Sequence, residues 1–160
     1  MQRHLYLGAA SLLVIIAAGK LALAQPAAAP PPTPAQIIRA RQAAYEMSVV
    51  TFSQLKRAVD TGNDVTKQKF AADALAGWAA VLPTLYPEGT GPGQTAVETG
   101  ALAEVWSNRA GFLARANAYK AATAKLVDAA KAGDASQFAN QVDAIKKACD
   151  ACHADFKVRD

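Results

Sequence analysis

The chain has 160 residues, enough for one domain with a buried core, and carries 17 basic and 13 acidic residues, a formal net charge of +4. Two of the basic residues lie in the first 24 residues, which contain no acid, so the remainder carries a net charge of only +2. This small charge is scattered along the chain, which excludes a basic surface for nucleic acid or for an anionic membrane.

The first 24 residues have the layout of a secretory signal peptide. Arg3 precedes an apolar stretch at 5–18, and a small-x-small ending follows at Ala24. We therefore expect cleavage before Gln25 and export, which in a bacterium means the periplasm. The alternative is an uncleaved membrane anchor, but the apolar stretch is shorter than the roughly 20 residues of a spanning helix. Contact with a membrane is expected only if the signal is not cleaved.

Residues 25–34 form a lead-in rich in Pro and Ala, without hydrophobic periodicity. The folded domain is expected to cover residues 35–160. Its first helix has a capping box, with Thr33 as N-cap and Gln36 three residues later. The helical pattern then continues to Gly62, a glycine typical of helix C-termini.

Three further helices are expected along the chain. The second follows residues 63–64 and is broken at Pro83, after which the chain is rich in Pro and Gly. The third is expected from about 98 to 131, ending at Gly133, and the fourth begins after Asp134 as N-cap. Alanine is abundant and alternating β-branched runs are absent, so the predicted fold class is all-α.

Large side chains step by three and four along these helices, with one charged exception. They are Ile38, Arg41, Tyr45, Ser48, Phe52, Leu55 and Val59 on the first helix, Val105, Phe112, Tyr119 and Leu126 on the third, and Phe138, Val142, Ile145, Cys149, Cys152 and Phe156 on the fourth. This spacing predicts an antiparallel up-down-up-down four-helix bundle. Arg41 either extends outward to solvent or faces a bulky anionic group between the helices, for which Ser48 leaves room.

Cys149, Cys152 and His153 form the pattern C-x-x-C-H, the attachment signature of a c-type haem. Two cysteines at i and i+3 share one helical face, so both sulfurs can form thioethers with one porphyrin edge. The adjacent imidazole can then ligate the iron from one side. The sequence therefore predicts one covalent haem c with His153 as its metal ligand, and haem propionates would give Arg41 an anionic partner.

Other uses of the two cysteines fit less well. A disulfide has no need of the adjacent histidine, although the expected compartment is oxidising. A thioredoxin-like pair is expected in a β-α-β setting, and structural zinc takes four ligands where three are at hand. A bundle without haem is the simplest alternative, and a pyridine haemochrome assay separates it from the prediction.

The chain resembles the cytochrome c′ family, four-helix bundles with one haem c near the C-terminus. The resemblance covers essentially the whole domain and rests on RQAAYEM at 41–47, ETGALAEVW at 98–106 and KKACDACHADFK at 146–157. It implies that Arg41 and Gln42 lie beside the propionates. It also implies that Glu98 and Thr99 lie near the haem edge, although Ala103 stands where the family has proline.

The resemblance gives Tyr45 a particular meaning. Low-spin relatives place a ligating methionine at this position, whereas high-spin members place a residue that does not bond to the iron. Met47 lies about 200° further round the helix and should point away. No other methionine or histidine follows the signal apart from His153, and lysine or tyrosinate ligands would need unusual deprotonation. We therefore expect five-coordinate, high-spin ferric iron with Tyr45 over its open face.

The predicted function is that of a periplasmic mono-haem c-type cytochrome. The resemblance implies electron transfer, binding of small diatomic gases (NO, CO), or both. The alternative is a dedicated low-spin electron carrier of the same fold. We do not expect an enzyme, because a haem peroxidase needs a distal acid–base group and only Arg41 could serve. The expected partners are haem, a gas ligand and a periplasmic redox protein of unidentified nature. Relatives commonly pair through their first two helices, so a homodimer is compatible with the sequence.

Overall fold

The computed structural model describes residues 29–158 of the chain. By its contacts the chain divides between Pro30 and Pro31, and the second part holds the helical domain. The predicted signal peptide, 1–24, and the first residues of the lead-in lie outside the described residues. Within the described range, no helix combines the length and apolar character needed to span a bilayer.

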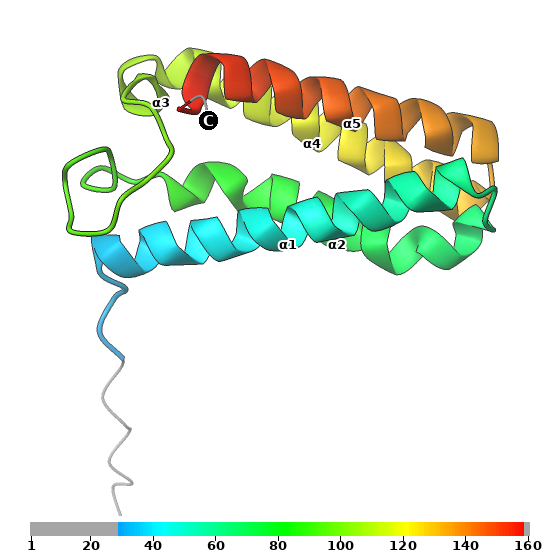
Figure 1. Ribbon diagram of the computed structural model, residues 1–160, viewed down its shortest axis with the longest axis horizontal. Coiled ribbons are helices and arrows are strands. Elements are labelled where there is room, and N and C mark those ends of the chain that lie inside the picture. Colours follow the sequence, from blue (N-terminus) through cyan, green and yellow to red (C-terminus); the bar gives the residue numbers. More distant parts are fainter. Residues whose placement is uncertain (1–28, 159–160) are drawn as a thin grey trace, which may run out of the picture. The chain divides into compact units, whose positions relative to one another are not determined.

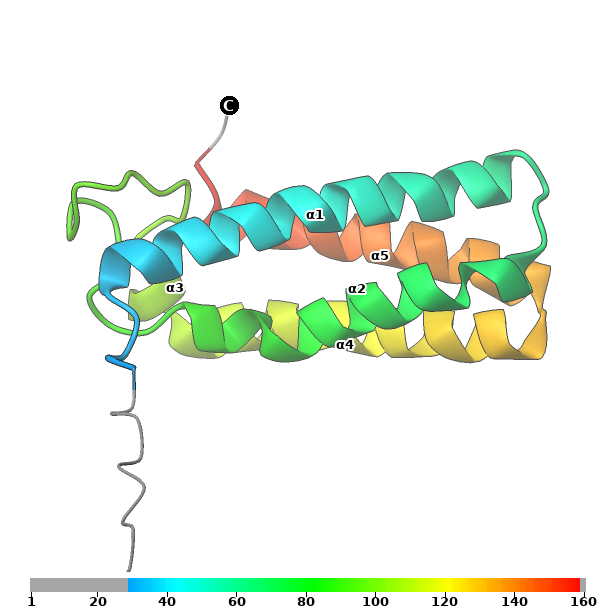
Figure 2. The same cartoon turned by 90° about the horizontal axis from the view of Figure 1, so that it is seen from below.

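Four long helices form an antiparallel bundle (Figures 1 and 2). They are α1 (Pro34–Asp60), α2 (Lys69–Val81), α4 (Arg109–Ala132) and α5 (Ala135–Phe156); 3₁₀ segments (Val65–Gln68 and Leu82–Leu85) flank α2, and a single turn, α3 (Glu104–Ser107), precedes α4. Helix α4 packs closely against α2 and α5. Of the four pairs of neighbouring long helices, α1 and α5 are packed least closely. The all-α up-down-up-down four-helix bundle is confirmed, with its looser side between α1 and α5.

The capping box at the start of α1 is present as predicted. The Gln36 amide donates to the Thr33 hydroxyl at 3.3 Å, and the Gln36 side-chain oxygen accepts from the Thr33 amide at 2.8 Å. Pro34 occupies the first helical turn, where its missing N–H costs nothing. Local sequence alone therefore determines where α1 begins.

Replacing Thr33 by Ala is expected to destabilise the protein by about 1 kcal/mol, because it removes an N-cap acceptor. The measurement is the urea midpoint of the folded protein. Ser53→Ala is the matched control: Ser53 is exposed in the middle of α1 and its hydroxyl donates back to the Val49 carbonyl, a bond that contributes little to a helix. Equal midpoints for the two variants would contradict a capping role for Thr33.

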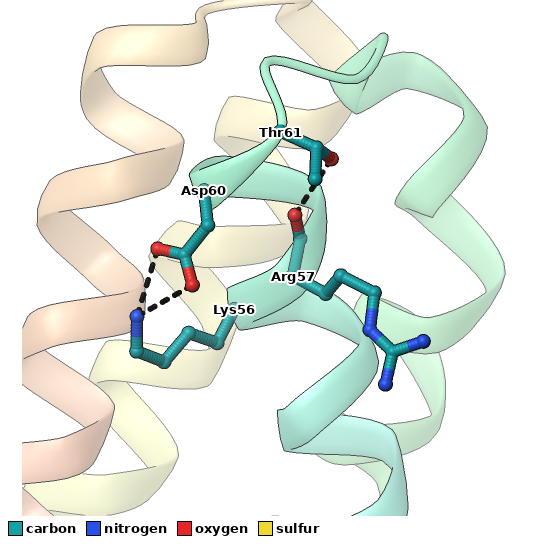
Figure 3. A network of polar contacts seen from close by, with 4 residues as sticks. All are labelled: Lys56, Arg57, Asp60 and Thr61. Carbon is teal, nitrogen blue, oxygen red and sulfur yellow. Dashed lines mark hydrogen bonds and ion pairs between the residues drawn. The ribbon is translucent and has the colours of Figure 1, made fainter.

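Polar side chains form a surface network at the C-terminus of α1 (Figure 3). The Thr61 hydroxyl donates to the Arg57 carbonyl at 2.8 Å, and Lys56 pairs with Asp60 at 2.7 Å. The ion pair is more than half exposed, so it adds little stability. The helix stops because Gly62 adopts a left-handed conformation, with φ of +63°, as its position in the sequence predicted.

The boundaries of the other helices agree in part with those predicted from the sequence. Asp64 caps the 3₁₀ turn before α2, and Pro83 lies inside the 3₁₀ turn Leu82–Leu85 after it. Gly133 ends α4 with φ of +69°, and the Asp134 carboxylate accepts from the first turn of α5. Both of these signals are confirmed.

The predicted start of the third helix, at residue 98, is wrong. Residues 98–103 belong to the loop, and Asn108 separates the single turn of α3 from α4. The hydrophobic spacing concealed this break, because Val105 and Phe112 keep a seven-residue interval and are both buried. Periodicity alone does not distinguish one continuous helix from two helical segments in register.

Candidate functional site

A cavity of about 310 Å³ lies where α1 faces the last turns of α5. A second cavity of about 250 Å³ shares part of its wall. Seven of the eight site residues predicted from the sequence line one or both: Arg41, Gln42, Tyr45, Thr99, Cys149, Cys152 and His153. Glu98 does not line either cavity. The loose contact between α1 and α5 therefore coincides with the place where the predicted site residues meet.

The two cysteines lie one turn apart on α5 and are free thiols, partly buried. Burial raises the pKa of both thiols, that of Cys152 to about 11, to which the neighbouring Cys149 thiol also contributes. Redox-active and metal-binding cysteines need the opposite shift, toward the thiolate. Among residues 29–158, no three His, Cys, Asp or Glu side chains gather as a metal-binding group. In this setting both thiols keep their protons near neutral pH.

Arg41 is 2% exposed, so the interpretation that it extends outward to solvent is wrong. Its Nη1 donates to the Leu85 carbonyl at 3.3 Å and the Thr90 hydroxyl at 3.0 Å. Its Nη2 donates to the Thr90 carbonyl at 2.8 Å and the Thr99 hydroxyl at 2.6 Å. Burial lowers the pKa of Arg41, but a guanidinium in a protein keeps its proton. Four of its five N–H groups thus bind neutral oxygens of Leu85, Thr90 and Thr99, and its pairing with propionates stays a prediction.

The loop at 86–103 closes one end of the cavity. Figure 1 shows it in green, at the end of the bundle where α1 begins and α5 finishes. The Gln42 side chain donates to the Glu98 carbonyl at 2.9 Å, and the Val158 amide donates to the Gly100 carbonyl at 2.8 Å. Arg41 and Gln42 on α1 are therefore hydrogen-bonded directly to Thr99 and Glu98 before α3, and Glu98 takes part through its backbone carbonyl.

Tyr86 is a cavity residue that the sequence analysis missed. Its hydroxyl donates to the Tyr45 hydroxyl at 3.1 Å, and its ring packs against Phe112 with a centroid distance of 4.9 Å. Burial raises the pKa of both tyrosines, so neither supplies a tyrosinate near neutral pH. Tyr86 follows the break at Pro83 in a loop without periodicity; its one sequence signal is an aromatic residue inside a Pro/Gly-rich stretch.

Two neighbours of Tyr45 lie as their helical positions predict. Met47 is 65% exposed and does not line either cavity. Ser48 lines the second cavity, and its hydroxyl donates to the Tyr45 carbonyl at 2.7 Å. The methionine therefore faces solvent, while the small serine side chain leaves space beside Tyr45.

The residues around the two cavities fit a covalently held porphyrin. Both thiols and the His153 imidazole come from consecutive turns of one helix and line adjoining cavities. Aromatic and aliphatic side chains, such as Phe52 and Phe112, form most of the remaining wall, as a macrocycle requires. Cys149 and Cys152 can supply the two thioether sulfurs, and His153 can supply the axial nitrogen.

Comparison with known proteins agrees with this site. Residues 36–157 match the family model described as cytochrome c′. A cytochrome c′ of Rubrivivax gelatinosus is 35% identical over 127 residues, which cover 78% of this chain and 95% of that protein. A crystal structure of cytochrome c′ from Rubrivivax gelatinosus at pH 8.0 superimposes with a TM-score of 0.71 at 28% identity, covering 78% of this chain and 97% of that chain. A ferrous variant of cytochrome c′ from Alcaligenes xylosoxidans with bound NO gives a TM-score of 0.71 at 25% identity, covering 80% and 98%. The chain therefore belongs to the cytochrome c′ family, whose members are c-type haem proteins, and Cys149, Cys152 and His153 provide its attachment motif for haem c.

Proposed function

We propose that this protein is an exported mono-haem cytochrome c′ that binds NO and CO opposite His153 and also transfers electrons. The observation that carries the proposal is the position of Tyr45 in the wall shared by both cavities, with Met47 turned to solvent. After residue 28 the sequence contains one histidine and one methionine, His153 and Met47. A second strong neutral ligand is therefore missing from the described residues, which favours five-coordinate, high-spin ferric iron.

The chemistry of the cavity wall supports gas binding. The raised pKa of Tyr45 keeps its phenol neutral, and a neutral phenol is a weak iron ligand. The wall around it is largely apolar, which suits small uncharged diatomics better than anions. A ferrous variant of the Alcaligenes xylosoxidans cytochrome c′, 25% identical to this chain, has NO bound and is a precedent for NO binding in this fold.

Each of the other site residues has a proposed role in holding the cofactor. Haem, when bound, supplies an iron that alternates between ferric and ferrous and offers a free coordination position. Arg41 and Gln42 would lie beside its propionates, with Thr99 and Glu98 positioning the adjoining loop through their contacts with these two side chains. Cytochromes c′ are in general periplasmic, so we propose that residues 1–24 direct export.

Spectroscopy of the purified holoprotein tests the proposal. We expect a high-spin ferric spectrum, and a large optical change when CO is added to the reduced protein. Tyr45→Met is the matched variant, since a methionine here should ligate the iron, give a low-spin spectrum and weaken CO binding. A six-coordinate low-spin spectrum of the unmodified protein, or no response to CO and NO, would instead identify a dedicated electron carrier.

A further inference from the structure

The hydroxyls of Tyr45 and Tyr86 form a phenol pair in the wall of the larger cavity. Tyr45 comes from α1 and Tyr86 from the loop that follows α2, and their oxygens are 3.1 Å apart. Both side chains line the cavity that Cys152 and His153 also line. The pair therefore adds a polar group to a largely apolar wall on the α1 side of the site.

Packing holds both rings in place. The Tyr45 ring meets Trp78 edge-on, with centroids 5.0 Å apart and planes at 79°. The Tyr86 ring lies between Phe112, at 4.9 Å, and the Arg41 guanidinium, 4.5 Å from its centroid. Rings confined in this way lose little further freedom when their hydroxyls form a hydrogen bond. The two oxygens are thus held together by the surrounding side chains.

The phenol pair carries one O–H proton more than its own hydrogen bond uses. Each phenol carries one O–H proton and can also accept a hydrogen bond. The bond between the two oxygens uses one of the two protons, whichever oxygen donates, and so one O–H proton is left over. Burial raises the pKa of both tyrosines, so both protons stay in place near neutral pH.

We infer that the phenol pair donates one hydrogen bond to the outer atom of a diatomic ligand bound opposite His153, with Tyr86 acting as the positioning residue for Tyr45. This inference rests on the proposed gas-binding function and specifies it further. The site would favour ligands whose outer atom gains negative charge on binding, because such atoms accept hydrogen bonds strongly. Tyr45 would then be both the residue that covers the open face and a donor to the ligand.

The infrared stretch of CO bound to the reduced holoprotein tests this inference, since a hydrogen bond to the CO oxygen lowers its frequency. The variant Y45F/Y86F is expected to raise the C–O stretch and to release CO about fivefold faster, the effect of losing one hydrogen bond. Y45F removes the donor and should shift the band about as far as the double variant, whereas Y86F keeps the Tyr45 hydroxyl and should give a smaller shift and a broader band, because that hydroxyl loses its partner. S53A, which removes an exposed hydroxyl of α1 that lines neither cavity, should keep the wild-type band.

Failure of this inference and failure of the proposed function give different results with CO. If the wild type and Y45F/Y86F bind CO with the same stretch, the inference is wrong and the proposed function stands. If the wild type does not bind CO, the proposed function fails. Transfer to D₂O gives a check that needs no double variant: the wild-type band should move, and the band of Y45F should move less. An unchanged wild-type band in D₂O would also overturn the inference.

Discussion

Replacing both Cys149 and Cys152 by Ala is expected to abolish covalent haem. Each sulfur forms one thioether, so acid–acetone should extract all haem from the double variant and none from the unmodified protein. A haem stain on a denaturing gel gives the same comparison. Loss of a ligand that binds only the folded state should also lower the thermal midpoint of the bundle.

The control for this experiment lies between the two cysteines. Asp150 is exposed and pairs with Lys146 on the surface of α5, so Asp150→Ala changes the same turn without removing a sulfur. It should keep its haem through acid–acetone extraction, and each single cysteine variant should keep haem through one thioether. Covalent haem in the double variant would contradict the attachment site.

Replacing Arg41 by Met is expected to destabilise the protein by about 3 kcal/mol, because the carbonyls of Leu85 and Thr90 and the hydroxyls of Thr90 and Thr99 lose their charged donor. Methionine keeps an unbranched, apolar stem in the helix, so the lost contacts are mainly the hydrogen bonds. The urea midpoint of the holoprotein measures the change. Amide hydrogen exchange at 86–103 should also become faster, because this loop is held to α1 by Arg41 and Gln42.

Arg39→Met is the matched control, because Arg39 lies two residues away on α1 and is exposed. It should change the free energy of unfolding by no more than about 0.5 kcal/mol. Similar destabilisation by both variants would show that Arg41 matters only through the charge or helix propensity of α1. Unchanged exchange at 86–103 in Arg41→Met would show that other contacts hold the loop.

Local sequence determined most of the helix boundaries of this protein and the motif that binds its cofactor. The capping box at Thr33, the glycine stops at Gly62 and Gly133 and the three-and-four spacing of large residues act within a few residues of each other, so they can be read without the fold. The C-x-x-C-H pattern is local in the same sense, because Cys149, Cys152 and His153 lie on one helix.

Only the tertiary structure decided what surrounds that motif. The sequence marks Arg41 as out of place in its apolar seam, but its partners lie 44 to 58 residues away, in the 3₁₀ turn after α2 and in the loop that follows, where no periodicity indicates them. Tyr86, 41 residues from Tyr45, was missed for the same reason, and the break at Asn108 was concealed by spacing that continues across it. Hydrogen bonds between distant segments depend on where the bundle places the loop. The sequence therefore predicts the cofactor, whereas the folded chain determines the polarity of the wall that faces it.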